Sequence, residues 1–321
     1  MTSLCSSRLV ARAAAAFLFL FLINMAQAAF YVSEENGGWI EQYSDSGADL
    51  GQFGPGGLAK PYGVALDATG NLYIAQVDNG AIEKYSSTGA DLGVFATLPS
   101  GPSQSGPMGL IFDSAGNLLV SDYNNNRIEK FSSAGTDLGQ FNIGGTLSNP
   151  TGFAFDNLGN LFVTNLGNNS VAKYSPTGSF IGNLQNSNLN MPAGIVFDSQ
   201  GRILVSNYAT GAIRAFNPTT GQDTGLFANT GFGSTNYGLG LDATGNVWVA
   251  LREANFLEEF NSGGSSVAFV SSNGSPAFFA FSEPAAVPEA STWAIAVLAG
   301  LFLLARMVST RCSHARLGNR R

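Results

Sequence analysis

One short pattern recurs five times along the chain: an Asp, two further residues, a Gly, and then Asn or Arg. Its copies begin at Asp67, Asp113, Asp156, Asp198 and Asp242, at steps of 46, 43, 42 and 44 residues. A fixed period in this range is typical of repeat architectures, and of a propeller when each unit reads as strands. The period therefore restricts the fold before any other feature is considered, and it makes most of the repeated residues structural.

The repeat over residues 107–141 shows what one unit contains. A short apolar run, 110–112, is followed by a turn in which the Asp113 carboxylate can bond backbone amides and Gly116 can take a left-handed conformation. Three more strand-like segments, separated by further turns, follow before residue 141. Four strands within one repeat form a propeller blade.

Three columns recur when the six copies are aligned. The second residue of the hairpin between strands two and three is always Gly or Asn, which predicts a positive φ there. An apolar residue follows two positions later and an aromatic residue three positions beyond that, and we interpret both as packing between blades. The columns are Gly38, Gly80, Asn126, Asn169, Gly211 and Asn255; Ile40, Ile82, Ile128, Val171, Ile213 and Leu257; and Tyr43, Tyr85, Phe131, Tyr174, Phe216 and Phe260.

The two ends of the repeat region complement each other. Residues 30–53 lack the first strand of a repeat, whereas 276–282 supply a first strand alone, with Phe278 in place of the usual Gly. Pairing these segments completes a sixth blade and removes the open edges. The predicted fold is all-β: a six-bladed β-propeller of four-stranded antiparallel blades over residues 29–283. One blade is closed by the N- and C-terminal strands, and short helical segments are expected only at the two termini.

The repeat resembles the NHL repeat, a family of six-bladed propellers. The resemblance spans residues 30–283, is clearest in the repeat that begins at Pro107, and is weakest in the copy over 237–264. The residues that carry it are Pro107, Gly109, Asp113, Gly116, Asn117, Leu119, Asp122, Asn126, Arg127 and Ile128. The resemblance implies the fold, whereas the function stays open because such propellers serve as binding modules, lyases and sensor domains.

The N-terminal residues 1–28 predict a secretory signal peptide. Arg8 and Arg12 precede an apolar run that ends at Met25, and a small-x-small site ending at Ala28 follows. A retained membrane helix is the alternative, for which the apolar run is short. We expect cleavage after Ala28 and export through the inner membrane.

The C-terminal residues combine a short motif, an apolar segment and basic residues. In order, these are the motif Val287, Pro288 and Glu289 within the linker 284–292, a predicted transmembrane segment 293–308, and a basic cytoplasmic tail 309–321. This order resembles the PEP-CTERM sorting segment of Gram-negative, exopolysaccharide-producing bacteria, although Ala290 stands where that motif has a second Pro. The resemblance implies a sorting protease of exosortase type as a partner, transient residence in the inner membrane, and a final place at the cell surface or in the extracellular matrix. An ordinary C-terminal anchor is the alternative.

Composition narrows the chemistry of the predicted domain. Cys5, Cys312 and the single histidine, His314, all lie in the end segments. A Ser-His-Asp triad, a Cys-His pair and a zinc site built on His or Cys are therefore excluded within the domain. Seven of the 15 basic residues also lie in the end segments, so residues 29–289, with eight basic and 22 acidic side chains, carry a net charge of −14. Such a charge argues against a nucleic-acid partner.

Variable, polar connections on one face of the predicted disc indicate where a ligand would bind. The hairpins between strands two and three share this face, and two aligned columns border the channel mouth there: the last residue of strand two and the residue after the opening Pro. From these columns we predict six ligand-binding candidates: Glu34, Tyr62, Asp122, Asn165, Asn207 and Tyr237. Carboxylates, amides and tyrosines suit sugar hydroxyls. A solvated surface without a dedicated ligand is the alternative.

The sequence predicts no catalytic residue and no cofactor, and it leaves one metal alternative open. Calcium takes carboxylate and amide oxygens, so a site would form if Glu34, Asp122, Asn165 and Asn207 clustered near the axis. The five Asp residues of the repeated turns are interpreted as turn caps, with calcium ligation as their alternative.

Two classes of function follow from these observations. The favoured one is an exported, non-catalytic binding or scaffold protein of the cell envelope or matrix, with a glycan or a protein as its ligand. The alternative is a propeller enzyme, a lyase or a lactone hydrolase, that would act on an extracellular substrate without His or Cys, with or without calcium.

Overall fold

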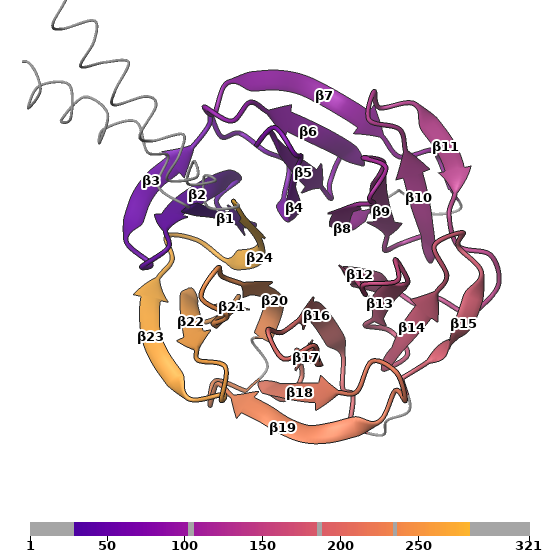
Figure 1. Ribbon diagram of the computed structural model, residues 1–321. Helices are drawn as coiled ribbons and strands as arrows, with labels where there is room; N and C mark the ends of the chain where they lie inside the picture. Colours follow the sequence, from indigo (N-terminus) through magenta and orange to yellow (C-terminus); the bar gives the residue numbers. More distant parts are fainter. Residues whose placement is uncertain (1–28, 102–105, 185–187, 234–235, 283–321) are drawn as a thin grey trace, which may run out of the picture. The chain divides into compact units, whose positions relative to one another are not determined.

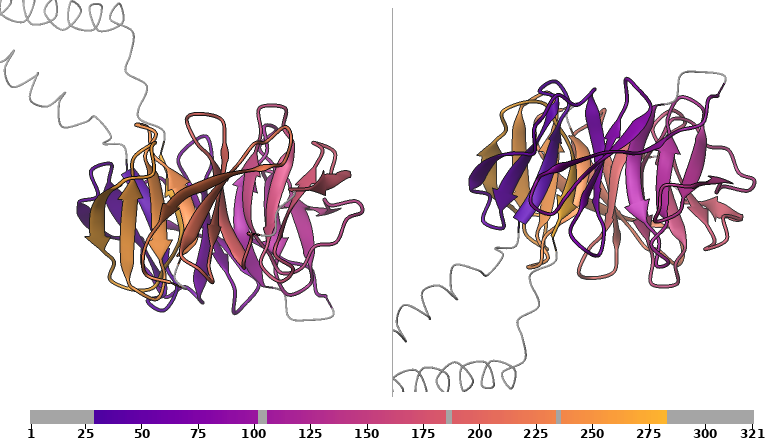
Figure 2. Two further views of the ribbon diagram at one scale, coloured as in Figure 1. Left: turned by 90° about the horizontal axis from the view of Figure 1, so that it is seen from below. Right: turned by 90° about the horizontal axis from the view of Figure 1, so that it is seen from above.

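The computed structural model describes residues 29–101, 106–184, 188–233 and 236–282 of the 321-residue chain. These residues form six four-stranded antiparallel sheets arranged as blades around a central axis (Figure 1). The strands run between two faces that carry the turns and connections (Figure 2). The prediction of an all-β, six-bladed propeller is confirmed, and the described residues contain no helix.

Each blade is described from its inner to its outer strand. Blade 1 contains β24 (Pro276–Phe281), β1 (Ala29–Glu34), β2 (Trp39–Ser44) and β3 (Asp49–Phe53), and blade 2 contains β4 (Pro61–Leu66), β5 (Leu72–Gln76), β6 (Ala81–Tyr85) and β7 (Asp91–Thr97). Blade 3 contains β8 (Pro107–Phe112), β9 (Leu118–Asp122), β10 (Arg127–Phe131) and β11 (Asp137–Gln140), and blade 4 contains β12 (Pro150–Phe155), β13 (Leu161–Asn165), β14 (Ser170–Tyr174) and β15 (Phe180–Asn183). Blade 5 contains β16 (Pro192–Phe197), β17 (Ile203–Asn207), β18 (Ala212–Phe216) and β19 (Asp223–Asn229), and blade 6 contains β20 (Asn236–Leu241), β21 (Val247–Leu251), β22 (Phe256–Phe260) and β23 (Ser266–Ser271).

Blade 1 is the composite blade predicted from the two incomplete repeats. Strand β24 lies antiparallel to β1, with Phe281 opposite Phe30 and Phe279 opposite Val32. Beyond this ladder, the Ser282 N–H donates to the Ala29 carbonyl at 2.9 Å, and the Ala29 N–H donates to Ser282 Oγ at 2.8 Å. The two ends of the domain are therefore joined through the backbone, as the sequence predicted.

The repeated Asp residues cap their own turns. In each of the five, Oδ1 accepts the N–H groups two and four residues further on; for Asp67 these are Thr69 at 2.9 Å and Asn71 at 3.0 Å. Burial by itself would raise the pKa of Asp67, but the hydrogen bonds from Thr69 and Asn71 lower it to about 2. The interpretation of these five residues as turn caps is confirmed.

The hairpins between strands two and three have the predicted left-handed residue. Its φ lies between 55° and 71° at Gly38, Gly80, Asn126, Asn169, Gly211 and Asn255. Gly and Asn tolerate this conformation at little cost, which explains why the column contains no other residue.

Six of the apolar clusters of the core each lie between two neighbouring blades. The six apolar residues and six aromatic residues of the two packing columns are all buried, none more than 2 % exposed. Their interpretation as packing between blades is therefore confirmed. Because every blade buries its faces only against its neighbours, the core depends on all six seams at once.

Among the described residues, no helix has the length and apolar character needed to cross a membrane. The predicted signal peptide 1–28, the motif from Val287 to Glu289, the anchor 293–308 and the basic tail 309–321 lie outside the described residues.

We expect Phe131→Ala to lower the free energy of unfolding by about 3–5 kcal/mol, because truncation of a buried ring removes its contacts and leaves a cavity. Phe131 is 1 % exposed and lies in the cluster between blades 2 and 3. Denaturant unfolding measures the change. Leu138→Ala in the same blade is the control, since its side chain is 53 % exposed, and we expect it to change stability by no more than about 0.5 kcal/mol. Equal losses at both positions would contradict the packing role.

Candidate functional site

The inner strand of every blade has a β-bulge close to its beginning. In β4, for example, Pro61 lies opposite Gln76 and Val64 lies opposite Ile74, so one extra residue is accommodated between them. A bulge re-aims the side chains at its centre. The second residues of five inner strands meet in one buried cluster that contains Tyr62, Met108, Ala193, Tyr237 and Ala277. Because they come from five different blades, this cluster lies on the central axis, where the inner strands converge (Figure 1).

A hydroxyl from the second strand fixes the bulge in four of the six blades. In blade 3, Ser121 Oγ accepts the N–H of Gly109 at 2.7 Å and donates to the carbonyl of Thr151 in blade 4 at 3.0 Å. Ser33, Thr164 and Ser206 make the same pair of bonds in blades 1, 4 and 5. These hydroxyls bond the backbone groups that the bulge frees, and so hold the axial residues in place.

The third residue of the inner strand is Gly in five blades because the next blade comes too close for a side chain. A Cβ on Gly109 would collide with the carbonyl of Thr151 in the neighbouring blade. Blade 1 has Phe278 instead, and its ring lies 5.5 Å from the ring of Tyr237 in an edge-to-face arrangement. Phe278 therefore adds to the aromatic cluster that closes this end of the channel.

A second ring of side chains surrounds the axial cluster. It consists of the residues that directly follow the second strand of each blade: Glu35, Val77, Tyr123, Leu166, Tyr208 and Arg252. In five of the six, the backbone N–H donates to a carbonyl of the connection that leads into the same blade, as Tyr208 does to Met191 at 3.0 Å. The connections thus hold these five residues at the channel mouth.

Arg252 and Glu35 form an ion pair across the seam between blades 6 and 1, through Nε and Oε2. The guanidinium carbon lies 5.6 Å from the ring centre of Tyr62 and 5.5 Å from that of Tyr237. The Arg252 side chain is 24 % exposed, whereas that of Glu35 is 4 % exposed. The structure therefore presents one oriented cation at the mouth, held by a buried carboxylate and two aromatic rings.

Four tyrosines surround this ion pair. The ring of Tyr237 meets those of Tyr62 and Tyr208 at centre distances of 5.7 and 5.9 Å, and Tyr123 packs against the same cluster. The Tyr208 hydroxyl donates to the Glu253 carboxylate. Burial raises the pKa of all four hydroxyls above the ordinary value of 10. They are therefore protonated near neutral pH and act as hydrogen-bond donors. We call Glu35, Tyr62, Tyr123, Tyr208, Tyr237 and Arg252 the mouth site.

The predicted site residues divide into two groups. Tyr62 and Tyr237 lie in the axial cluster, as expected of residues at the channel mouth. Glu34, Asp122, Asn165 and Asn207 were expected on a polar rim, but the structure buries all four completely. Asp122, Asn165 and Asn207 use their Oδ1 atoms to accept backbone N–H groups of the connections that enter their blades, at 3.1, 3.2 and 2.8 Å. Whether any of them contacts a ligand stays a prediction.

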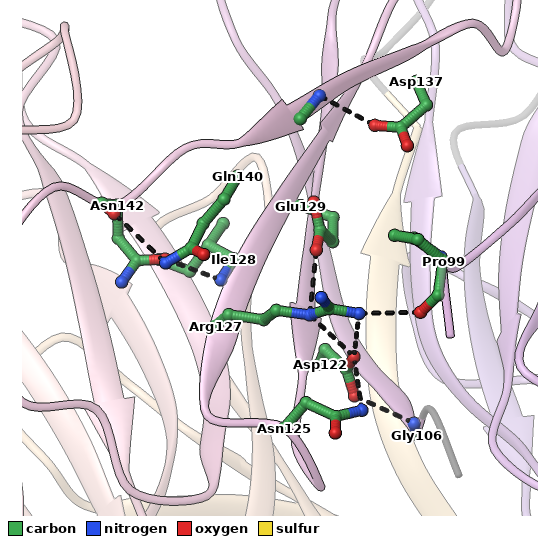
Figure 3. A network of polar contacts seen from close by, with 11 residues as sticks. Pro99, Gly106, Asp122, Asn125, Arg127, Ile128, Glu129, Asp137, Gln140 and Asn142 are labelled. Atoms are coloured by element: carbon green, nitrogen blue, oxygen red, sulfur yellow. Dashed lines mark hydrogen bonds and ion pairs between the residues drawn. The ribbon is translucent and has the colours of Figure 1, made fainter. Parts of the chain in front are cut away.

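The carboxylate of Asp122 is bonded to several groups of the protein itself (Figure 3). Besides the Gly106 N–H, its carboxylate accepts the Asn125 amide at 2.9 Å and pairs with Arg127 at 3.2 Å. Arg127 also pairs with Glu129 at 2.8 Å and donates to the Pro99 carbonyl at 2.7 Å. This network ties a hairpin to the preceding connection, so the carboxylate has a structural role.

The structure does not bring together the four residues considered for calcium. Glu34, Asp122, Asn165 and Asn207 belong to blades 1, 3, 4 and 5, and the bonds described for them connect each to its own blade or to the connection that enters it. Within the described ranges, no group of three or more His, Cys, Asp or Glu side chains is arranged to hold a metal ion.

Glu35, Tyr123, Tyr208 and Arg252 are not among the residues predicted from the sequence. They lie one position beyond the last residue of strand two, which was the predicted column. In the next column, Arg252 is the single basic residue and Glu35 the single acidic one among six copies. The sequence signal for Glu35 and Arg252 is that one aligned column contains a single acidic and a single basic residue, and that these two residues belong to adjacent blades.

The channel beneath the mouth site is lined by apolar side chains and glycines. A cavity of about 390 Å³ is lined by the later residues of the inner strands, from Gly63 and Gly109 to Leu66, Phe112, Leu241 and Phe281. No charged side chain lines it. The charged and hydroxyl-bearing side chains of the channel are therefore concentrated at one end, on the face of the hairpins and the blade-to-blade connections.

Comparisons with known proteins bear on the fold. No protein-family model matches the chain, and no curated protein matches it. Among solved structures, the chain is similar to one from a nidogen/laminin complex, with 17 % identity and a TM-score of 0.70 over 80 % of this chain and 99 % of that one. It is similar to a streptogramin B lyase at 19 % identity, with a TM-score of 0.62 over 78 % of this chain and 82 % of that one. A Bacteroides caccae protein of unknown function has 15 % identity and a TM-score of 0.64, over 80 % of this chain and 99 % of that one. At these identities the likeness shows the propeller fold alone, in proteins that include a lyase and a chain from a protein complex.

Glu34 differs from its counterparts in the other blades. Its Oε1 accepts the Ser272 hydroxyl at 2.7 Å, but Oε2 is buried without a hydrogen-bond partner among the described residues. Burial raises the pKa of Glu34 to about 8; the bond from Ser272 opposes this, and the charges of Glu41 and Asp49 add to it. The carboxyl is therefore largely protonated at neutral pH, in the seam that closes the ring.

Glu34→Gln should flatten the pH dependence of stability. The protonated carboxyl contributes stability that is fully present below pH 4.5, its ordinary pKa, and is lost progressively as the pH rises to about 8. Denaturant unfolding across this range measures the slope for each protein. Some slope should remain, because burial also raises the pKa of Glu258 to about 7. Gln76→Glu, which places a carboxyl at the equivalent buried position of blade 2, should steepen the fall. Equal slopes in all three proteins would contradict the role of Glu34.

Proposed function

We propose that this protein is an exported, non-catalytic binding propeller of the cell envelope or extracellular matrix, which captures its partner at the mouth site. The observation that carries the proposal is the Arg252–Glu35 ion pair among four tyrosines, at the point where residues of all six blades converge. Tyr and Arg are the side chains most often found at the energetic centres of binding sites. They stand here on a rigid scaffold, which lowers the cost of ordering them when a partner binds.

The exposure of Arg252 supports a role beyond closing the ring. Among the described residues its ion pair uses Nε, so the terminal nitrogens can donate to the Tyr208 hydroxyl and to a partner. The other seven basic side chains of the described residues also form ion pairs, but none of their partners belongs to the mouth site. Arg252 is thus the one among these eight whose ion pair lies within the mouth site.

The protonation of the tyrosines favours binding over catalysis. A tyrosine acts as a general base only when its pKa is lowered, whereas burial raises the pKa of Tyr62 and Tyr237 despite the nearby guanidinium. The described residues contain no His or Cys to serve instead. The enzyme alternative, a lyase or lactone hydrolase, has no set of residues in its favour here.

Export and sorting complete the proposal. The signal peptide over residues 1–28 would direct the chain through the inner membrane. The C-terminal segment would then hold it there until a protease of exosortase type releases the propeller to the surface or the matrix. The sequence patterns support this proposal, including the NHL-like and PEP-CTERM-like resemblances.

Intact-mass analysis of the extracellular form tests the sorting. We expect a protein that begins near Ala29 and ends between Pro288 and Ser291. Pro288→Ala with Glu289→Ala should keep the protein in the inner membrane, because the protease would lose its motif. Release of a form that still ends at Arg321 would refute the sorting proposal.

Paired neutral substitutions test the mouth site. Glu35→Gln with Arg252→Gln removes both charges and leaves neither one buried alone, so the fold should survive. We expect the double variant to bind purified extracellular matrix at least about tenfold more weakly, since a hydrogen bond to a charged group contributes about 1.5–3 kcal/mol. Sedimentation of the protein with the matrix measures the binding.

The matched control is Asp113→Asn with Lys130→Gln, which neutralises an ion pair on the opposite face whose basic side chain is as exposed as that of Arg252. This variant should bind like the wild type, and thermal unfolding should confirm that both variants are folded. If the control loses binding and the mouth variant retains it, the site lies on the other face of the disc.

A further inference from the structure

The mouth site combines features that together define a class of ligand. Resting on the function proposed above, we propose that the partner is a neutral glycan, and that a single pyranose ring of it occupies the channel mouth. The choice of a neutral sugar over an acidic one, and of a glycan over a protein, follows from three properties of the site.

The first property is the alternation of donors and acceptors. The guanidinium of Arg252 and the protonated hydroxyls of the tyrosines donate, while the carboxylates of Glu35 and Glu253 accept. Every sugar hydroxyl is at once a donor and an acceptor, so adjacent hydroxyls can bond to an Arg and a Glu together. The half-buried rings of Tyr123 and Tyr208 add apolar faces against which the C–H groups of a pyranose can pack.

The second property is the sign of the charge. The charges of the Arg252–Glu35 pair balance within the mouth site, and the carboxylate of Glu253, which accepts the Tyr208 hydroxyl beside it, adds a negative charge. Residues 29–289 carry a net charge of −14, which disfavours the approach of anionic ligands. A uronic acid or a phosphorylated sugar would meet this repulsion, whereas a neutral sugar would not.

The third property is size. Tyr62, Tyr237 and Glu35 are only 7 %, 4 % and 5 % exposed, so the mouth offers a small surface framed by the hairpins. A stable protein interface buries about 800 Å² on each partner. The exposed parts of the mouth site suit one sugar ring much better than a protein surface of that area.

An oligosaccharide array tests the inference on the full chain as released by the cells. The probes are neutral gluco-, galacto- and manno-oligosaccharides, with oligogalacturonates and oligoglucuronates as their acidic counterparts. We expect binding to at least one neutral series and binding at least about tenfold weaker to both acidic ones. Because no net charge is neutralised, the affinity should change by less than about twofold between about 50 and 500 mM salt.

The double variant Glu35→Gln with Arg252→Gln should lose the neutral oligosaccharide, and the opposite-face control Asp113→Asn with Lys130→Gln should keep it. Tyr208→Phe, which removes one hydroxyl and leaves the ring, should weaken binding without changing thermal stability. Preference for an acidic series, or neutral binding that survives in the double variant, overturns the inference.

Two further outcomes separate this inference from the function on which it rests. If no oligosaccharide binds, but matrix binding depends on Arg252 and is abolished by protease treatment of the matrix, the partner is a protein. In that case the glycan inference fails and the binding function stands. If matrix binding is indifferent to the mouth site as well, both fail.

Discussion

The backbone ladder between β24 and β1 is the constraint on which the rest of the molecule depends. Each apolar cluster lies between two blades, so a ring that failed to close would expose two apolar faces to water. Closure also brings Glu35 next to Arg252, although 217 residues separate them in the chain. The candidate site is therefore a product of ring closure, and neither half of it would exist in an open array of blades.

The pKa values of carboxylates in this propeller shift in opposite directions, depending on the hydrogen bonds that each carboxylate accepts. Asp67 receives backbone and side-chain donors, and these hold its pKa at about 2 in spite of burial. Glu34 receives a single hydroxyl, so burial dominates and its pKa rises to about 8. Glu35 is buried beside Arg252 and obtains its counter-charge across the seam. The acidic residues of this domain thus have three roles. Asp67 and its equivalents cap turns, Glu34 is a protonated buried carboxyl, and Glu35 holds the partly exposed guanidinium of Arg252.

The bulge in each inner strand links the architecture to the site. In four blades a Ser or Thr hydroxyl bonds the backbone groups that the bulges free across the seam, as Ser121 does between Gly109 and Thr151. The side chain at the centre of the bulge is thereby held at the axis. Positions that repeat for structural reasons in five blades become a binding surface where they carry Tyr62 and Tyr237.

The sequence by itself determined the number of blades, the ring closure, the left-handed hairpin residues, the Asp caps and the packing columns. These features depend on local turn chemistry and on the period of the repeat, and both can be read from the residues of each repeat. It also indicated the face of the mouth and two of its residues, Tyr62 and Tyr237. Only the tertiary structure decided that Glu34, Asp122, Asn165 and Asn207 turn inward to bond the chain itself. It alone paired Arg252 with Glu35, because burial and contacts between distant blades depend on how the ring closes, which no single repeat encodes.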